Sequence, residues 1–230
     1  MSSFATGMRL GARMGAARLF GRPLLILALL ALSTSAVVAM SERDRELLAA
    51  PSRALGVVLA WILPLVCFAI VSLVLGRARL DECAWPIAKY GIARRVVSLG
   101  LIACSMLAAT LVGVASVLVT LSLSYARMPG LWRDLVTSSW IAALGACAYV
   151  ALFALGAGFL RLGRGRWAAL AFDFLIAGGT GAVAAAGPRA HLRSLLGGAP
   201  VLELSQPQSS VWLLAMTIGF ALLAAMRAGD

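Results

Sequence analysis

Six long apolar runs, separated by short polar segments, dominate the pattern along the 230-residue chain. Each is close to or above the roughly 20 apolar residues that a membrane-spanning helix needs. Their apolar character is continuous rather than alternating, which favours helices over the strands of a membrane barrel. We therefore expect an all-α, polytopic membrane protein with six transmembrane helices and short loops, the helices lying at about residues 24–40, 54–75, 96–123, 135–160, 167–186 and 211–226.

Residues 24–227 are expected to form a single membrane domain, because no low-complexity linker or clear internal repeat divides them. Residues 1–23 precede this domain as a basic segment. It is expected either to lie on the membrane surface as an interfacial helix or to remain a frayed tail. Within it, Gly7, Gly11 and Gly15 recur every four residues, a spacing that would let another helix approach closely.

The first apolar run also has a second interpretation. Basic residues up to Arg22, an apolar stretch and the small residues 33–36 resemble a signal peptide with a weak cleavage site. The apolar character continues to Met40, further than a cleaved peptide needs. This length favours a membrane-spanning helix.

The composition excludes an ordinary soluble domain. Hydrophobic residues make up 62% of the chain, charged residues 13%, and the mean hydropathy is +0.96. Soluble domains are roughly 45–50% apolar and about 25% charged, because water must solvate their surface. The lipid bilayer is therefore the expected solvent for most of this chain.

The basic residues indicate an orientation. The net charge is +11, but the Lys and Arg side chains lie between apolar runs. We therefore interpret them as topology signals and contacts with anionic lipid, and expect no nucleic-acid partner. With the N-terminus inside, thirteen lie in inner segments and seven in outer ones, which predicts two cytoplasmic termini. Abundant Arg, Ala and Gly suggest a GC-rich bacterial genome, and hence the bacterial inner membrane.

Motifs for catalysis and cofactor binding are absent from the sequence. It contains no phosphate-binding loop of the G-x-x-x-x-G-K-[ST] type, no H-E-x-x-H and no G-x-S-x-G. Its single histidine, His191, excludes a multi-histidine metal site, and no two of its four cysteines have Cys-x-x-Cys spacing. We therefore expect no enzyme activity, catalytic residue, metal or cofactor.

The inner loop, residues 76–95, carries the densest group of polar and aromatic side chains. Leu80, Cys83, Ile87 and Tyr90 are spaced so that they would line one face of a short helix on the membrane surface. Such a helix would be either a docking element for a cytoplasmic partner or a membrane-anchored loop without one. The candidate docking residues are Asp81, Glu82, Trp85, Pro86, Lys89 and Tyr90.

Asp173 is the acidic residue that lies well inside an apolar run. An ionised Asp near the bilayer centre costs about 2.5–3.5 kcal/mol on insertion scales, so this carboxyl needs a reason to be there. It is either a proton- or substrate-linked group or a structural carboxyl, paired with an arginine such as Arg161 or Arg166. We favour the structural role, with hydrogen bonds to Ser, Thr or backbone groups of a neighbouring helix.

A polar group also precedes the last run, in the expected outer loop. Arg189, His191 and Arg193 lie there within five residues. They are candidates for contact with a lipid headgroup or a substrate. The alternative is that His191 is simply an interfacial residue of a short helix.

The layout resembles the permease subunits of ABC transporters, specifically the type-2 exporter class. In that class an acidic residue, a Pro-containing turn and a basic residue lead into the third helix, as Asp81, Glu82, Pro86 and Lys89 do here. The segment 188–200 before the last run is the second point of resemblance.

This resemblance implies a division of labour. In such permeases the loop after the second helix docks on a separate ATP-binding subunit, and two permease chains line the path. The function expected here is therefore the membrane subunit of an ATP-driven exporter, working as a homo- or heterodimer. The alternative is a multi-pass membrane protein for interaction or assembly that transports nothing; an intramembrane enzyme is a third and weaker possibility.

Overall fold

A computed structural model describes residues 3–125 and 131–229. Arg127, one of the seven basic residues assigned to outer segments, lies outside this range. The α-helices are α1 Ser3–Leu19, α2 Arg22–Arg45, α3 Ala50–Val57, α4 Leu63–Leu75, α5 Leu80–Ala88, α6 Arg94–Tyr125, α7 Leu131–Ala157, α8 Gly165–Leu175, α9 Pro188–Leu195 and α10 Gln206–Arg227, with a π-helical segment at Val58–Ile62 and 3-10 turns at Arg161–Gly163 and Ala184–Ala186.

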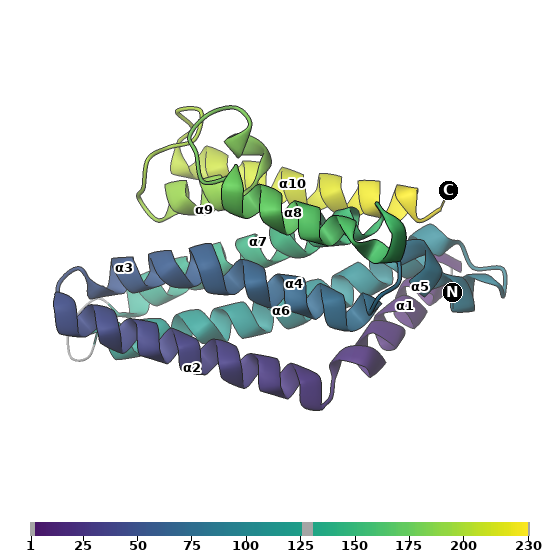
Figure 1. Ribbon diagram of the computed structural model, residues 1–230, viewed down its shortest axis with the longest axis horizontal. Coiled ribbons are helices and arrows are strands. Elements are labelled where there is room, and N and C mark those ends of the chain that lie inside the picture. The colour runs from purple at the N-terminus through teal and green to yellow at the C-terminus, as the bar shows by residue number, and fades with distance from the viewer. Residues whose placement is uncertain (1–2, 126–130, 230) are drawn as a thin grey trace.

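The long helices lie side by side along one axis, as Figure 1 shows, and both termini lie at the same end of the bundle. We call this the terminal end and the opposite one the far end. Among the described residues, five helical stretches are long and apolar enough to cross a membrane: Arg22–Arg45, Ala50–Ala88, Arg94–Tyr125, Leu131–Ala157 and Gln206–Arg227. The all-α prediction is confirmed, and the apolar helices are those expected of a membrane-spanning protein.

Helices α6 and α7 form the centre of the bundle, and α7 is the most buried of the long helices. Its inward side chains Tyr149 and Phe153 are both fully buried. Helices α2 and α10 lie at the periphery and leave rows of large apolar side chains exposed. This apolar exterior agrees with lipid as the solvent.

The glycines of the N-terminal segment lie where α1 packs against α6, so the close approach predicted from their spacing is observed. A Cβ atom built on Gly11 would lie 2.1 Å from the carbonyl oxygen of Val97. Conversely, a Cβ on Gly100 of α6 would lie 2.2 Å from the carbonyl oxygen of Met8. No larger residue fits at either position unless the two backbones separate.

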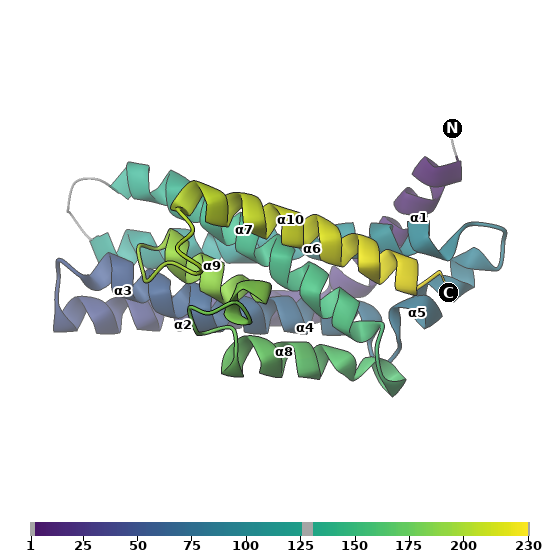
Figure 2. The same cartoon turned by 90° about the horizontal axis from the view of Figure 1, so that it is seen from above.

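The fifth predicted helix, 167–186, is not one helix, and the sequence prediction is wrong here. Helix α8 ends at Leu175, turns follow, and the 3-10 turn Ala184–Ala186 precedes α9. Eleven residues of α8 rise only about 16 Å, roughly half the hydrocarbon thickness. In Figures 1 and 2, α8 runs back from the terminal end and α9 lies beyond it, nearer the far end.

Local sequence explains why the helix stops. Residues 178–181, which we call the glycine segment, have the sequence Gly-Gly-Thr-Gly, and each interior glycine disfavours a helix by roughly 1 kcal/mol. Pro188 then starts α9, because its fixed φ suits the first helical position and it cannot continue a preceding helix. The mean hydropathy of residues 167–186 is high despite this interruption, so it did not indicate that the helix breaks.

Candidate functional site

The break between α8 and α9 is held by three polar side chains of α9. Arg193 donates hydrogen bonds to the carbonyl oxygens of Gly178 and Gly179. His191 is fully buried, and its Nε2 lies 2.9 Å from the carbonyl oxygen of Ala185. Backbone carbonyls outside a helix need such partners at membrane depth, because lipid offers none.

Arg189, the third of these side chains, links the break to the helical stretch Ala50–Ala88. Its guanidinium donates to the carbonyl oxygens of Phe174, at 3.3 Å, and Ala60, at 2.5 Å. It also lies over the rings of Phe174 and Trp61, at 4.5 and 4.7 Å from their centroids. Cation–π contacts of this kind stabilise a guanidinium that has little contact with water.

The carbonyl of Ala60 is available because of an irregularity in its own helix. Ala60 lies in the π-helical segment Val58–Ile62, and the residue four positions later is Pro64. Proline has no N–H to donate to that carbonyl. Arg189 supplies a donor instead, so two irregular segments, far apart in the sequence, complete each other's hydrogen bonding.

Asp173 occupies the same region, at the last turn of α8, and is fully buried. Its carboxyl accepts a hydrogen bond from the hydroxyl of Tyr149 at 3.1 Å and a longer one from the backbone N–H of Arg189 at 3.4 Å. The pairing suggested from the sequence, with Arg161 or Arg166, is not what the structure shows. Arg166 instead donates to the carbonyl oxygen of Gly76, at the terminal end.

Sequence reasoning therefore found Asp173 and the three residues of α9, but not what they contact. It did not identify Tyr149 or the carbonyl of Ala60 as their partners. Two signals were present in the sequence: a tyrosine in the middle of an apolar helix, and a proline four residues after Ala60. Neither signal indicates which distant residue completes the pair.

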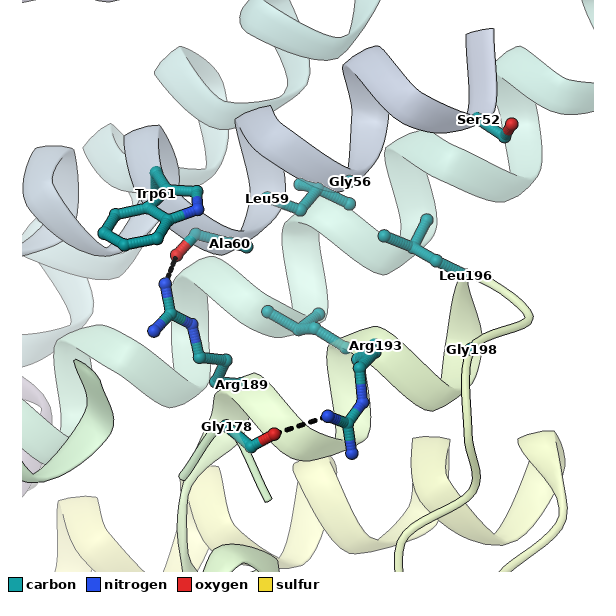
Figure 3. A pocket seen from close by; sticks show the side chains of 11 residues that line it. Ser52, Gly56, Leu59, Ala60, Trp61, Gly178, Arg189, Arg193, Leu196 and Gly198 are labelled. Atoms are coloured by element: carbon teal, nitrogen blue, oxygen red, sulfur yellow. Dashed lines mark hydrogen bonds between the residues drawn. The ribbon is translucent and has the colours of Figure 1, made fainter. Parts of the chain in front are cut away.

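A cavity of about 370 Å³ lies beside this break. One wall comes from α3 and the π-helical segment, and the other from α9 and the loop that follows it (Figure 3). The figure shows Arg189 reaching from α9 toward Ala60, while Arg193 points to Gly178. Leu59, Trp61, Leu192 and Leu196 make much of the remaining lining apolar.

The inner loop forms a helix, as its spacing predicted, but a shorter one. Helix α5 spans Leu80–Ala88 and buries Leu80, Cys83 and Ala84. Tyr90 lies beyond its end and is 77% exposed, so it does not share the buried face. Pro86 lies inside the helix rather than at its start.

Two of the candidate docking residues also have structural contacts. Glu82 accepts a hydrogen bond from the backbone N–H of Arg79 at 2.8 Å, and Asp81 lies 3.2 Å from the guanidinium of Arg79. These carboxylates lie in the first turn of α5, where negative charge also favours the helix dipole. They hold the start of α5 whether or not anything docks there.

The other four candidates lie at the surface. Trp85, Pro86, Lys89 and Tyr90 are all exposed. The ammonium of Lys89 lies 5.7 Å from the ring centroid of Trp85 and 5.1 Å from that of Tyr90. They form a compact surface of aromatic and basic character, which we call the α5 surface, at the terminal end of the bundle (Figure 2).

Metal-binding chemistry is not evident at either place. Within residues 3–125 and 131–229, no three His, Cys, Asp or Glu side chains come together in a way that could hold a metal ion. The four cysteines are free thiols, and Cys67, Cys83 and Cys104 are buried.

Comparison with known proteins gives no relative: no family model, no curated protein and no solved structure matches this chain. The likeness to exporter permeases therefore rests on the sequence pattern alone.

Proposed function

We propose that this chain is the membrane-spanning permease subunit of an ATP-driven exporter of the ABC type-2 kind, located in the bacterial inner membrane with both termini in the cytoplasm. It couples to a separate ATP-binding subunit through the loop 76–95 and works as a dimer of permease chains. The observation that carries the proposal is the α5 surface.

The α5 surface supports docking because its shape and chemistry differ from those of a simple connection. A loop that only joined α4 to α6 would not need a capped helix with aromatic and basic side chains on its exposed side. Aromatic side chains are enriched at the centres of protein interfaces. The buried side of α5 is fixed to the bundle, and Arg18 of α1 reaches the sulfur of Cys83 at 3.3 Å. The Cys83 thiol in turn donates to the carbonyl oxygen of Leu75 in α4 at 3.4 Å, and α5 packs against α6. Movement of α5 would therefore be transmitted to α1, α4 and α6.

The break between α8 and α9 supports transport rather than a scaffolding role. Discontinuous helices inside a membrane are costly, because their backbone groups must be satisfied by protein, and transporters use them at substrate and ion sites. Here the break carries Asp173, Arg189, His191 and Arg193 and borders a cavity. This combination of a broken helix, charged side chains and a cavity favours transport over a role in assembly alone.

The test is whether an ATP-binding subunit binds at the α5 surface. A photo-crosslinking amino acid in place of Lys89 should capture a protein that hydrolyses ATP, and Trp85→Ala should reduce its co-purification. The matched control is Trp132→Ala, an exposed tryptophan at the far end. Reversing Asp81 and Glu82 is a poorer test, because it also removes the contacts that start α5.

The outcomes separate the two candidate functions. Capture of an ATP-hydrolysing protein at position 89, weakened by Trp85→Ala and unaffected by Trp132→Ala, supports the exporter. A specific partner without ATPase activity at the same surface would favour the interaction or assembly protein. Equal co-purification from all variants would refute docking at α5.

A further inference from the structure

The cavity beside the break between α8 and α9 is lined by positive charge without an acidic counterpart. Its ionisable lining side chains are two arginines, Arg189 and Arg193, and no Asp or Glu is among its described lining residues. Neither guanidinium forms an ion pair with an acidic side chain in the part of the chain that the structure describes. Asp173 meets the backbone N–H of Arg189 rather than its guanidinium.

Both arginines have more N–H donors than their observed hydrogen bonds use. A guanidinium has five N–H donors, and the contacts of each residue are made through Nη1 and Nη2 to backbone carbonyls. The Nε of Arg193 is buried and has no partner among the described residues. Neutral carbonyl oxygens orient the two side chains and do not neutralise their charge.

The position of the cavity restricts what can fill it. Ala60 lies six residues inside the span expected at 54–75, so Arg189 meets that helix about 9 Å in from residue 54. Charged side chains at such depth are costly, and they mark sites where a ligand or ion is handled. Leu59, Trp61 and Leu196 supply an apolar wall beside the charges. The occupant therefore needs an anionic head and an apolar part.

From this geometry we infer that the cavity between α3 and α9 is a binding site for the phosphate group of an amphiphile, recognised by Arg189 and Arg193. Guanidinium groups pair with phosphate through parallel N–H···O bonds, which gives both strength and orientation. A volume of about 370 Å³ lies at the lower end of the range for small-ligand sites. It accommodates a phosphate head and the start of an apolar chain.

Two glycines keep the cavity open. A Cβ atom built on Gly56 or on Gly178 would meet no atom within 4 Å, and both residues line the cavity. A side chain at Gly56 would project into this space while leaving both arginines in place. This allows the cavity to be filled and its charge to be removed in separate variants.

The experiment measures binding by the chain alone, without any ATP-binding subunit, so it fails or succeeds independently of the exporter proposal. The purified protein is placed in phosphatidylcholine nanodiscs that contain spin-labelled phosphatidic acid. Spin-labelled phosphatidylcholine is the zwitterionic comparison. We expect a motionally restricted fraction of the phosphatidic acid that exceeds the phosphatidylcholine fraction.

Two variants test the site, and two matched variants control for them. Arg193→Gln should weaken phosphatidic acid binding roughly tenfold or more, the effect of losing a hydrogen bond to a charged group. Gly56→Leu should weaken it comparably by filling the cavity. Arg43→Gln removes an exposed charge at the far end, and Gly219→Leu adds the same side chain to α10, where a Cβ atom has no neighbour within 4 Å. Both controls should bind as the unaltered protein does.

Inorganic phosphate, compared with chloride at equal ionic strength, distinguishes the source of the anion. If it leaves phosphatidic acid in place, the ligand is a lipid headgroup. If it displaces the lipid and binds with the same dependence on Arg193, the site takes free phosphate, and the chemistry of the proposal holds. Equal restriction of the two spin-labelled lipids, or equal loss in Arg193→Gln and Arg43→Gln, would overturn it.

Discussion

Replacing Asp173 tests whether its carboxyl is a structural hydrogen-bond acceptor. Asp173→Leu removes the acceptor for two donors, the hydroxyl of Tyr149 and the backbone N–H of Arg189. A buried donor without a partner costs about 1–3 kcal/mol, whereas hydrogen bonds between membrane helices average about 0.6 kcal/mol. The 3.4 Å contact with Arg189 is the weaker of the two. We therefore expect a total loss of about 3 kcal/mol in the free energy of unfolding.

Asp173→Asn should be much milder. The amide oxygen can accept from the N–H of Arg189 and the amide nitrogen can donate to the hydroxyl oxygen of Tyr149, so that only the hydroxyl hydrogen of Tyr149 loses its acceptor. We expect a loss of about 1 kcal/mol. If the carboxyl and the hydroxyl act as a pair, Tyr149→Phe and Asp173→Asn should be non-additive in a double-mutant cycle.

The assay is unfolding of the purified protein by SDS in mixed micelles, followed by tryptophan fluorescence. Asp44→Leu is the control, because Asp44 is an exposed acidic residue near the end of α2. If Asp173→Leu unfolds at the same SDS fraction as this control, or if Asn is as damaging as Leu, the hydrogen-bond argument is wrong. An Asn variant that folds normally but has no transport activity would instead make Asp173 a functional residue.

Two further predictions concern packing and topology. Gly11→Ala should destabilise the contact between α1 and α6 by about 1–3 kcal/mol, measured in the same SDS titration, because the new Cβ would meet a backbone oxygen at 2.1 Å; Gly219→Ala, which meets nothing, should have little effect, and equal stability of the two variants would show that α1 is not held there. In a cysteine-free background, cysteines introduced at Arg45 and Gln206 should react with an impermeant thiol reagent from outside, while one at Arg164 should not; the reverse pattern would refute cytoplasmic termini.

The sequence by itself determined the class of the protein and several local structures. Apolar runs long enough to span lipid leave no alternative for a chain with so few charged residues, and five of the six expected runs are long apolar helices in the part of the chain that the structure describes. The close approach at the glycines of α1 and the helix at α5 could also be predicted, because both depend on residues three or four positions apart. Such spacing fixes which side chains share a helix face before any tertiary contact exists.

The fifth predicted helix, 167–186, could not be judged correctly from local sequence. Its average hydropathy is that of a spanning helix, yet the glycine segment tips the balance toward a break once distant groups satisfy the exposed carbonyls. Those groups are on α9 and α10: Arg193 binds the glycine segment, and Trp212 shares the carbonyl of Ala185 with His191. Without these donors an interrupted helix would leave unpaired carbonyls in lipid.

Only the tertiary structure could decide what Asp173 and Arg189 contact. The sequence places Asp173 sixteen residues from Arg189 and twenty-four from Tyr149, with Ala60 more than a hundred residues away. No helical or turn periodicity links such positions, so charge alone suggested nearer arginines. The actual partners follow from how the π-helical segment, α7, α8 and α9 pack, because a buried polar group is satisfied by whatever donor or acceptor the fold brings within about 3 Å.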